Sequence, residues 1–480
     1  MPLRIRFDPG YAAVLLAGLL VGSGPAVAET GKAAQQRQQQ AQILDSFGGV
    51  YDGAQAAYVT RIGEKVAVAA GMGGRCTFTL VNSDVINAFA APPGCYIYVT
   101  RGLLAILNSE AELAGVLGHE VGHVTAKHAN RQRNTQVLGG LAAVLVGAVS
   151  KSDQLGQLAG QVAQLGVLSY SRGQEYEADS LAVKYLPLAG YPADGISRAL
   201  AGLQRQDDFS LRTAGDTAGQ VIPVWARTHP LTGDRIARAT RAAAAADGVA
   251  RSPSNEAAFL SAVDGLVYGD DPSQGFVRGA VFAHTGLRIG FTAPRGFSVI
   301  NGASAVAVNG PKGLRGQLSA GKYANGRLED FAGVVIRNAL GEGGGNIGQP
   351  QRTTINGLET VFLPARATSQ GQSVDVSAVV YDLGNGDTYQ FVTIAPAGQS
   401  ATFDTMYASF HRLTDAEAAR YKARRIEVVG VRPADTAQSL SSRMSTDVDK
   451  LGLFQMLNDV KPAEALASGR RVKLVTEVRK

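Results

Sequence analysis

Residues 119–123 read His119-Glu120-Val121-Gly122-His123. Residues four apart lie on one face of a helix, so both imidazoles can reach the same metal ion. An H-E-x-x-H pattern on a helix is typical of a zinc site whose glutamate takes a proton from water. We therefore predict zinc ligands at His119 and His123 and a catalytic base at Glu120. Apolar residues at helical spacing predict that this helix is amphipathic and largely buried: Leu113, Val116, Leu117, Val121 and Val124.

The third zinc ligand is expected on a second helix, because two histidines leave a zinc site one protein ligand short. Within residues 171–179, Glu175 and Asp179 are again four apart on one helical face. Glu175 can bind the metal while Asp179 accepts the free N–H of a ligating imidazole, which fixes the orientation of that ring. We expect one Zn²⁺ per chain, held by His119, His123 and Glu175.

The chain resembles the HtpX/BepA/Oma-type zinc metallopeptidases, gluzincins related to the CAAX prenyl proteases, from about Tyr58 to about Ala239. In chain order, the matched segments are Asn87-Ala88-Phe89-Ala90 with Gly102-Leu103-Leu104; Leu117 to His123 with His128; Ser171-Arg172 with Glu175, Ala178 and Asp179; and Thr228-His229-Pro230 with Arg235-Ile236. The resemblance implies that Glu175 is the third ligand. It also implies that His229 and Arg235 are catalytic. These residues would stabilise the oxyanion of the transition state or occupy the open zinc position in a resting state.

Other titratable residues near these motifs have simpler interpretations. His128 lies five positions after His123, so on a continuous helix it is rotated away from the metal, and we expect a structural or surface role. Glu177 follows Glu175 by two positions and is expected to be solvated. For His229, the alternative to a role at the metal is entry into the helix that follows.

The chain has two cysteines, Cys76 and Cys95, and each begins a segment of alternating apolar and polar residues. We predict two strands paired as an antiparallel hairpin, with a disulfide between the cysteines in an oxidising compartment. In zinc peptidases of this architecture, a strand beside the active-site helix holds the substrate in extended form. The hairpin is the natural candidate for such strand addition, and Asn87, Ala88 and Phe89 are the candidate substrate-strand residues.

The N-terminus has the pattern of a signal peptide, residues 1–28. Two arginines precede the apolar run Tyr11 to Val21, and Ala26-Val27-Ala28 offers a small-x-small cleavage site. We expect cleavage after Ala28 and a periplasmic or secreted protein. An uncleaved membrane anchor is the alternative, but the run is shorter than the about 20 apolar residues that a bilayer requires.

A second apolar stretch, Val137 to Val149, is also too short to span a membrane. Its glycines favour a buried helix or a mobile cover over the cleft. Peripheral membrane contact is a further possibility for this stretch.

Charge argues against nucleic-acid binding. The formal net charge is +6 over 480 residues, and no block of lysine and arginine with interleaved aromatics is present in the sequence. We therefore expect polypeptide substrates as partners and no nucleic acid.

The fold class expected from length and pattern is α+β and multidomain. Residues 35–246 are predicted to form a mainly helical zincin-type catalytic domain with a small β-hairpin or sheet. Residues 259–413 read as a β-rich α+β domain of unknown role, and residues 425–480 as a small βααβ module. Within the middle domain, strands are expected at 287–291, 297–300, 360–363, 374–383 and 388–394, with a helix at 403–410.

The last module is similar to LysM, a small fold that holds glycan chains of the cell wall. Its strands are expected at 426–431 and 472–475, around helices at 437–444 and 454–458. The similarity implies peptidoglycan binding, although Ala434 stands where LysM modules usually have glycine. The alternative is a docking module for the protease, because a fold does not fix a function.

Together, the residues and the resemblance predict an exported zinc metalloendopeptidase. Its substrates would be misfolded or misassembled outer-membrane proteins, in quality control of the cell envelope. Two alternatives remain open. One is a latent peptidase that acts mainly as a chaperone, with His229 or the glycine-rich stretch Val137 to Val149 blocking the metal, and the other is a binding protein tethered to the cell wall.

Overall fold

The computed structural model describes residues 31–131, 170–213, 225, 229, 233–246, 253–302, 305–323, 326–341, 344–369, 371–446 and 448–477. Two expectations lie outside the described residues: the signal peptide with its cleavage after Ala28, and the apolar stretch Val137 to Val149. Among the described helices, none is both long and apolar enough to cross a membrane.

The chain divides into two compact units, Met1–Ala41 and Gln42–Lys480. Of the first unit, the structure describes the beginning of helix α1 (Gly31–Ser46), which is rich in glutamine. The second unit contains the remaining elements and mixes helices with sheets, which confirms the α+β class.

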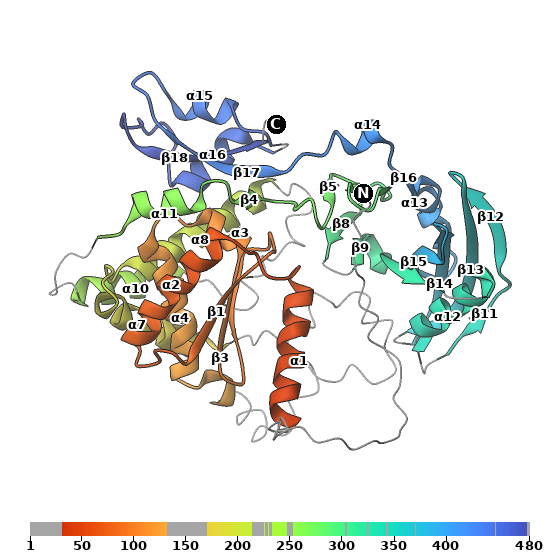
Figure 1. The fold of residues 1–480 in the computed structure, drawn as a ribbon, viewed down its shortest axis with the longest axis horizontal. Coiled ribbons are helices and arrows are strands. Elements are labelled where there is room, and N and C mark those ends of the chain that lie inside the picture. The colour runs from red at the N-terminus through yellow and green to blue at the C-terminus, as the bar shows by residue number, and fades with distance from the viewer. Residues whose placement is uncertain are drawn as a thin grey trace, which may run out of the picture. The chain divides into compact units, whose positions relative to one another are not determined.

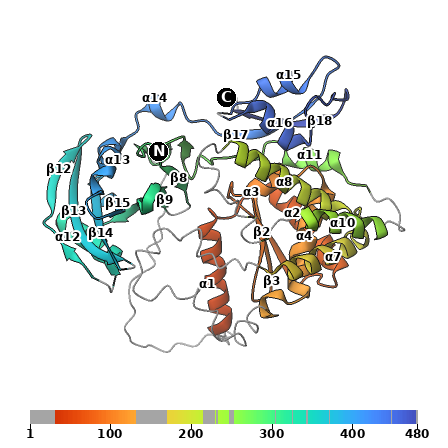
Figure 2. The same cartoon turned by 180° about the vertical axis from the view of Figure 1, so that it is seen from behind.

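The metal motif lies in a mainly helical part of the second unit (Figures 1 and 2). Its helices are α2 (Ala54–Ala69), α3 (Arg101–Ile106), α4 (Glu110–Thr125), α7 (Arg172–Leu188), α8 (Gly195–Thr213), α10 (Gly233–Ala246) and α11 (Glu256–Val263). A small sheet has the order β1-β3-β2, with β1 at Cys76–Val81, β2 at Ala88–Ala91 and β3 at Cys95–Thr100.

Side chains of β3 alternate between two apolar clusters, as the sequence pattern requires. Ile97 and Val99 join the large core that contains the helices, whereas Tyr98 packs on the opposite face with Phe47 and Phe89. Both faces of the small sheet are therefore covered.

The predicted hairpin is wrong in strand direction. Strands β1 and β3 pair in parallel, with Cys76 opposite Cys95, and the antiparallel partner of β3 is β2. Alternation reports which face a side chain takes and carries no information on direction, so the sequence pattern did not distinguish the two arrangements. The predicted disulfide between Cys76 and Cys95 is confirmed.

The middle part of the chain is built from antiparallel strands, followed by α14 (Asp415–Ala418). One sheet has the order β16-β7-β6-β5, with β5 at Phe276–Arg278, β6 at Val281–His284, β7 at Ile289–Thr292 and β16 at His411–Arg412. The larger sheet has the order β11-β13-β14-β15-β10-β9-β8, and β12 also pairs with β13. Its strands are β8 (Ser298–Asn301), β9 (Ala305–Asn309), β10 (Arg315–Lys322), β11 (Asn346–Ile347), β12 (Gln351–Ile355), β13 (Leu358–Ser369), β14 (Gln372–Asp382) and β15 (Asp387–Pro396).

Each face of the larger sheet packs on a helix. Helix α12 (Leu328–Leu340) contributes to one apolar cluster, and α13 (Asp404–Ser409) to the other. Short 3-10 helices lie at Pro311–Gly313 and Ser400–Phe403. The strands and the helix predicted here are confirmed to within a few residues at most ends. The sequence did not predict the other elements of this part, which are β5, β6, β9, β10, β11, β12, β16, α12 and α14.

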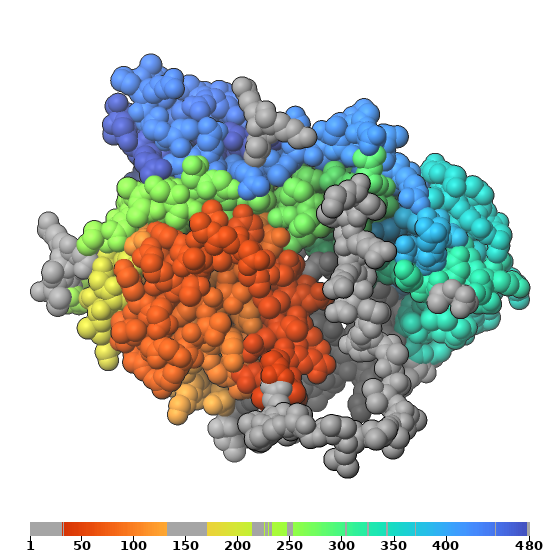
Figure 3. Space-filling model, in the orientation of Figure 1, coloured from red at the N-terminus to blue at the C-terminus, as the bar shows by residue number. Residues whose placement is uncertain are grey.

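The C-terminal part has the predicted βααβ order: β17 (Arg424–Gly430), α15 (Ala437–Ser442), α16 (Lys450–Asn458) and β18 (Arg471–Glu477). Strand β17 also pairs with β4 (Val267–Tyr268), which comes from before the middle part. In Figure 3, the green segment that includes α11 lies against both the red atoms of the helical part and the blue atoms of the C-terminal part. One apolar cluster includes residues of both parts, such as Leu203 and Phe454.

A fully buried lysine of β18 reaches into the helical part. The Lys473 Nζ donates to the carbonyl oxygens of Ala105 at 2.8 Å and Leu107 at 2.7 Å, at the end of α3. Burial lowers the pKa of Lys473 to about 7, the positive charge of Arg205 acts in the same direction, and the negative charge of Glu112 opposes the shift.

Replacing Lys473 with methionine should change how stability depends on pH. Because the pKa is about 7 in the folded chain and 10.5 in the unfolded chain, the unfolded state binds the extra proton between these values. Lys473 therefore makes the parent more stable as pH rises through this window, by up to about 1.4 kcal/mol per pH unit. Denaturant unfolding of both proteins at pH 7 and pH 9 measures this. The advantage of the parent should grow with pH, and a pH-independent difference would contradict the burial of an uncharged amine.

Candidate metal centre

The helix that carries the motif begins at a capped end. The Ser109 hydroxyl accepts a hydrogen bond from the Glu112 N–H at 3.2 Å, and acidic residues in the first turn complement the helix dipole. Every residue of α4 from Glu110 to His123 is buried. The motif therefore lies inside the protein, as its apolar periodicity predicts.

Glycines let the neighbouring helices approach α4 closely. A Cβ atom at Gly122 would lie 3.2 Å from the Ala178 carbonyl oxygen of α7, and one at Gly115 would lie 2.5 Å from the Ile196 nitrogen of α8. This close packing brings the backbone of α7 next to the histidines.

Helix α7 is fixed at its start by a capping box in which Ser171 and Gln174 exchange hydrogen bonds with each other's backbone N–H. The buried carboxylates Glu175 and Asp179 follow within the next two turns. The cap fixes the first turn, and the close approach to α4 directs both carboxylates at the motif.

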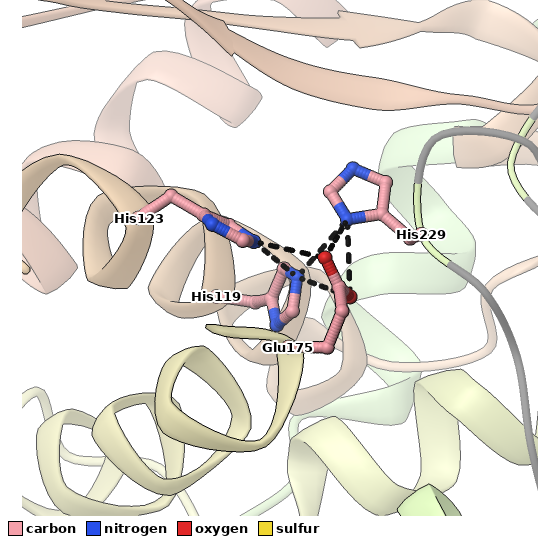
Figure 4. Close-up of side chains that lie close together, drawn as sticks. All are labelled: His119, His123, Glu175 and His229. Carbon is pink, nitrogen blue, oxygen red and sulfur yellow. Dashed lines mark hydrogen bonds and ion pairs between the residues drawn. The ribbon is translucent and has the colours of Figure 1, made fainter. Parts of the chain in front are cut away.

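Four buried side chains converge: His119, His123, Glu175 and His229 (Figure 4). Each offers one ligand atom, and these atoms all lie within 4.8 Å of one another. His119 Nε2 is 2.9 Å from His123 Nε2 and 3.3 Å from His229 Nδ1. Each of the first two histidines also lies 3.5 Å from a Glu175 oxygen.

This donor set fits zinc. Bonds of about 2.0–2.1 Å to a tetrahedral ion place neighbouring ligand atoms about 3.3 Å apart, close to the spacings observed. Imidazole nitrogens and a carboxylate are also the ligand types that catalytic zinc sites use.

Asp179 contacts the Nδ1 atom of His119, whose Nε2 atom faces the cluster. Its Oδ1 lies 2.9 Å from His119 Nδ1, and the Arg235 guanidinium donates to both Asp179 oxygens at 2.8 and 2.9 Å. Arg235 also pairs with Glu175 at 2.7 Å. Arg235 is thus bound by two carboxylates and is 1% exposed.

The pKa values of His119 and His123 are shifted in opposite directions. Burial alone would lower the pKa of His119, but the carboxylates of Asp179 and Glu175 raise it to about 9. Burial lowers the pKa of His123 well below its ordinary value, and His119 and His229 lower it further. Negative charge is therefore concentrated where a divalent cation would be stabilised.

Glu120 is fully buried, and within the described residues neither of its carboxylate oxygens has a hydrogen-bond partner. Burial raises the pKa of Glu120, against the opposing effect of His229 and His119. The His229 Nε2 lies 3.5 Å from its Oε1. A carboxylate with a raised pKa beside the ligand cluster is suited to accept a proton from water.

His229 completes the cluster from a different segment. Trp225 stacks on its ring at a centroid distance of 4.4 Å, and the His229 N–H donates to the Trp225 carbonyl at 2.7 Å. On the other side of the site, Tyr170 stacks on His123 at 3.9 Å. Two aromatic rings therefore pack directly on histidines of the cluster.

The candidate substrate strand lies at an edge of the small sheet. Strand β2 pairs with β3 on one side and contacts α4. Asn87, just before β2, is fully buried, and neither polar atom of its side chain has a hydrogen-bond partner among the described residues. A cavity of about 390 Å³ beside His123 is lined by Ala90, Cys95 and Val124, among others.

The contacts of two residues next to the ligands were not expected from the sequence. His128 is fully buried, and its Nδ1 lies 2.8 Å from His123 Nδ1. Glu177 is exposed, as the sequence predicts, with 45% of its side chain accessible, and it also pairs with His128 and Arg131. Lys127, the residue before His128, has a φ of 55° and interrupts the helix, and no sequence signal marks this turn because a lysine stands where glycine or asparagine is usual.

Comparisons with known proteins bear on this site. Residues 53–243 match the family model described as Peptidase family M48. A beta-barrel assembly-enhancing protease of Yersinia pestis is 30% identical over 200 residues, which cover 40% of this chain and 39% of that protein. A Protease HtpX homolog of Campylobacter concisus is 31% identical and covers 34% of this chain and 66% of that protein.

A third relative is the mitochondrial metalloendopeptidase OMA1 of Arabidopsis thaliana, 33% identical over 23% of this chain and 22% of that protein. The chain spans less than half the length of the beta-barrel assembly-enhancing proteases that it matches. The similarity covers the part of the chain that contains the metal cluster.

Proposed function

We propose that this chain is a zinc-dependent endopeptidase, because residues 53–243 match Peptidase family M48. The observation that carries the proposal is the buried cluster of His119, His123 and Glu175 beside the fully buried carboxylate of Glu120. Metallopeptidases of this family use zinc, and the donor atoms suit that ion.

Each residue has a distinct task in the proposed reaction. Bound zinc supplies Lewis-acid charge that polarises the peptide carbonyl and acidifies water at neutral pH. Glu120 takes the proton from the attacking water and passes it to the leaving amine. Asp179 holds the Nδ1–H of His119, and Arg235 holds Asp179 and Glu175 in place, so we propose a supporting role for Arg235 behind the ligands.

The edge strand β2 is proposed to hold the substrate. An extended peptide can add to the free edge of β2 through backbone hydrogen bonds, along Ala88 and Phe89. The Asn87 amide, buried with no partner among the described residues, could pair with the peptide backbone once a substrate is bound.

We propose outer-membrane proteins of the cell envelope as substrates, in quality control. The Yersinia pestis relative is named a beta-barrel assembly-enhancing protease, which supports this choice. The proposal includes export through a signal peptide at residues 1–28, a catalytic domain at 35–246 and a domain at 259–413. The proposed substrates can be tested by comparing the envelope proteins that accumulate in cells carrying Glu120→Gln with those in cells carrying the parent chain. Unchanged levels of outer-membrane proteins would contradict their role as substrates.

A latent peptidase is the second candidate, and the position of His229 favours it. Its Nδ1 lies 3.3 Å from His119 Nε2 and 3.1 Å from Glu175 Oε1, which makes it a fourth donor in the cluster. A fourth protein ligand would leave no open position for substrate or water.

His229→Ala should therefore increase the rate of peptide cleavage, because it opens the fourth position. Cleavage rate and zinc content of the variant should be measured beside those of His284→Ala, a histidine in strand β6. A rate lowered by about 10²–10³-fold would instead assign His229 to oxyanion stabilisation. Unchanged kinetics with intact zinc would remove both roles.

The C-terminal module, residues 425–480, is proposed as LysM-like. Its βααβ order supports this proposal, and its core packs together with that of the helical part, which favours docking over free tethering. Cosedimentation of the purified chain with cell wall tests the proposed binding of peptidoglycan, and cosedimentation with lipid vesicles tests peripheral membrane contact.

A further inference from the structure

We propose that His128 is a positioning residue that holds the second histidine ligand, His123, and is itself held by Glu177. The inference rests on the proposed zinc site. It assigns to α7 a second carboxylate that orients a ligand, in addition to Asp179.

The geometry of the two rings carries the inference. His128 Nδ1 lies 2.8 Å from His123 Nδ1, with ring centroids 4.8 Å apart and planes inclined by 73°. The contact is on the opposite side of the His123 ring from Nε2, the atom that faces His119. His128 thus touches a ligand without being part of the metal cluster.

The tautomers follow from this contact. When Nε2 of His123 binds a metal, the proton of the neutral ring resides on Nδ1, which must donate. His128 Nδ1 must then accept, so the proton of His128 resides on Nε2. That atom lies 3.2 Å from Glu177 Oε2, an acceptor. In both contacts, one atom is therefore a hydrogen-bond donor and the other an acceptor.

The chain of contacts continues to the surface. Glu177 Oε2 pairs with Arg131 at 2.5 Å, and Gln174 donates to the backbone carbonyl of His128 at 3.2 Å. His128 has no exposed surface, whereas 45% of the Glu177 side chain is exposed. The ring of His128 is therefore enclosed, and its orientation is set by the groups on α7.

The two histidine ligands are held in parallel ways. Asp179 Oδ1 contacts His119 Nδ1 directly at 2.9 Å, whereas Glu177 reaches His123 through the His128 ring. Residues that orient zinc ligands typically change metal affinity or activity by about 10–100-fold when they are replaced.

The test compares His128→Leu, which fills the space without an acceptor, with His128→Asn, whose carbonyl can accept near the position of Nδ1. Zinc dissociation constants from chelator competition are expected to rise by about 10–100-fold in His128→Leu. The Asn variant should restore most of the affinity. The visible spectrum of the Co²⁺-loaded protein should shift in His128→Leu and return toward the parent in His128→Asn.

A second pair of variants guards against loss of folding. Glu177 is partly exposed, so Glu177→Ala should fold, and it should weaken zinc binding in the same direction as His128→Leu. Glu464→Ala breaks a comparable surface pair with Arg470, and it should leave zinc affinity unchanged. These measurements do not need peptidase activity, so they remain decisive even if the chain cleaves no peptide.

Parent-like zinc affinity and an unshifted Co²⁺ spectrum in both His128→Leu and Glu177→Ala would overturn the inference. It would also be overturned if His128→Asn bound zinc as weakly as His128→Leu while the zinc-free proteins melted at the same temperature. That result would show that packing of the ring, and not its acceptor atom, supports the site.

Discussion

Glutamine in place of Glu120 is expected to leave one zinc bound per chain and to slow peptide cleavage by about 10²–10⁴-fold. The amide matches the carboxylate in size, and no ligand to the metal changes, so the site should remain assembled. What is lost is a fully buried carboxylate beside the cluster that neither serves as a proposed ligand nor pairs with Arg235. Zinc per chain and the rate of casein cleavage measure the two effects separately.

Glu256→Gln is the matched control for this change. Glu256 is an exposed glutamate in the first turn of α11, so the same substitution should leave both zinc and cleavage unaltered. If Glu120→Gln retained zinc and cleaved casein at nearly the parent rate, the proposed mechanism would be wrong.

Alanine in place of Glu175 is expected to remove zinc as well as activity. Glu175 supplies the one carboxylate in the cluster of four donors, and its side chain is fully buried. Removing it leaves a ligand set of histidines without the negative charge that offsets a divalent cation. Zinc content after dialysis should fall well below one per chain, as it should in His119→Ala and His123→Ala.

The contrasting result would be a Glu175→Ala protein that holds zinc as tightly as the parent. The third ligand would then have to be sought at Asp179, Glu177 or His128. His229 would be a further candidate, because its Nδ1 lies in the same cluster.

Two pairs of candidate residues could be recognised from the sequence because their spacing reflects helical periodicity. His119 and His123, and likewise Glu175 and Asp179, are four residues apart, and a helix places such pairs on one face whatever surrounds it. That the two helices pack together was not contained in this pattern. It depends on glycines such as Gly122, whose role becomes clear only when the neighbouring backbone of α7 is seen.

The position of His128 could not be predicted from helical periodicity, because the helix ends before that residue. The prediction assumed a helix that continues past His123, but α4 ends at Thr125 and Lys127 adopts a left-handed conformation with φ of 55°. This turn brings His128 back against His123. A lysine in such a conformation leaves no clear signal in sequence, since glycine or asparagine is the usual residue there.

The direction of strands β1 and β3 relative to each other also could not be predicted from the sequence. The alternation in residues 76–80 and 95–99 predicted the strands and the faces they expose, and the disulfide followed from their proximity. Whether they run parallel depends on the path of the chain between them, where β2 forms the antiparallel partner of β3.

We propose that this chain cleaves peptides with a zinc ion held at the cluster. Casein cleavage by the purified chain should be measured before chelation, after removal of the metal, and after addition of one equivalent of Zn²⁺. We expect cleavage to stop with the metal removed and to return as one zinc per chain is restored. Cleavage that persists in the chelated protein would contradict it.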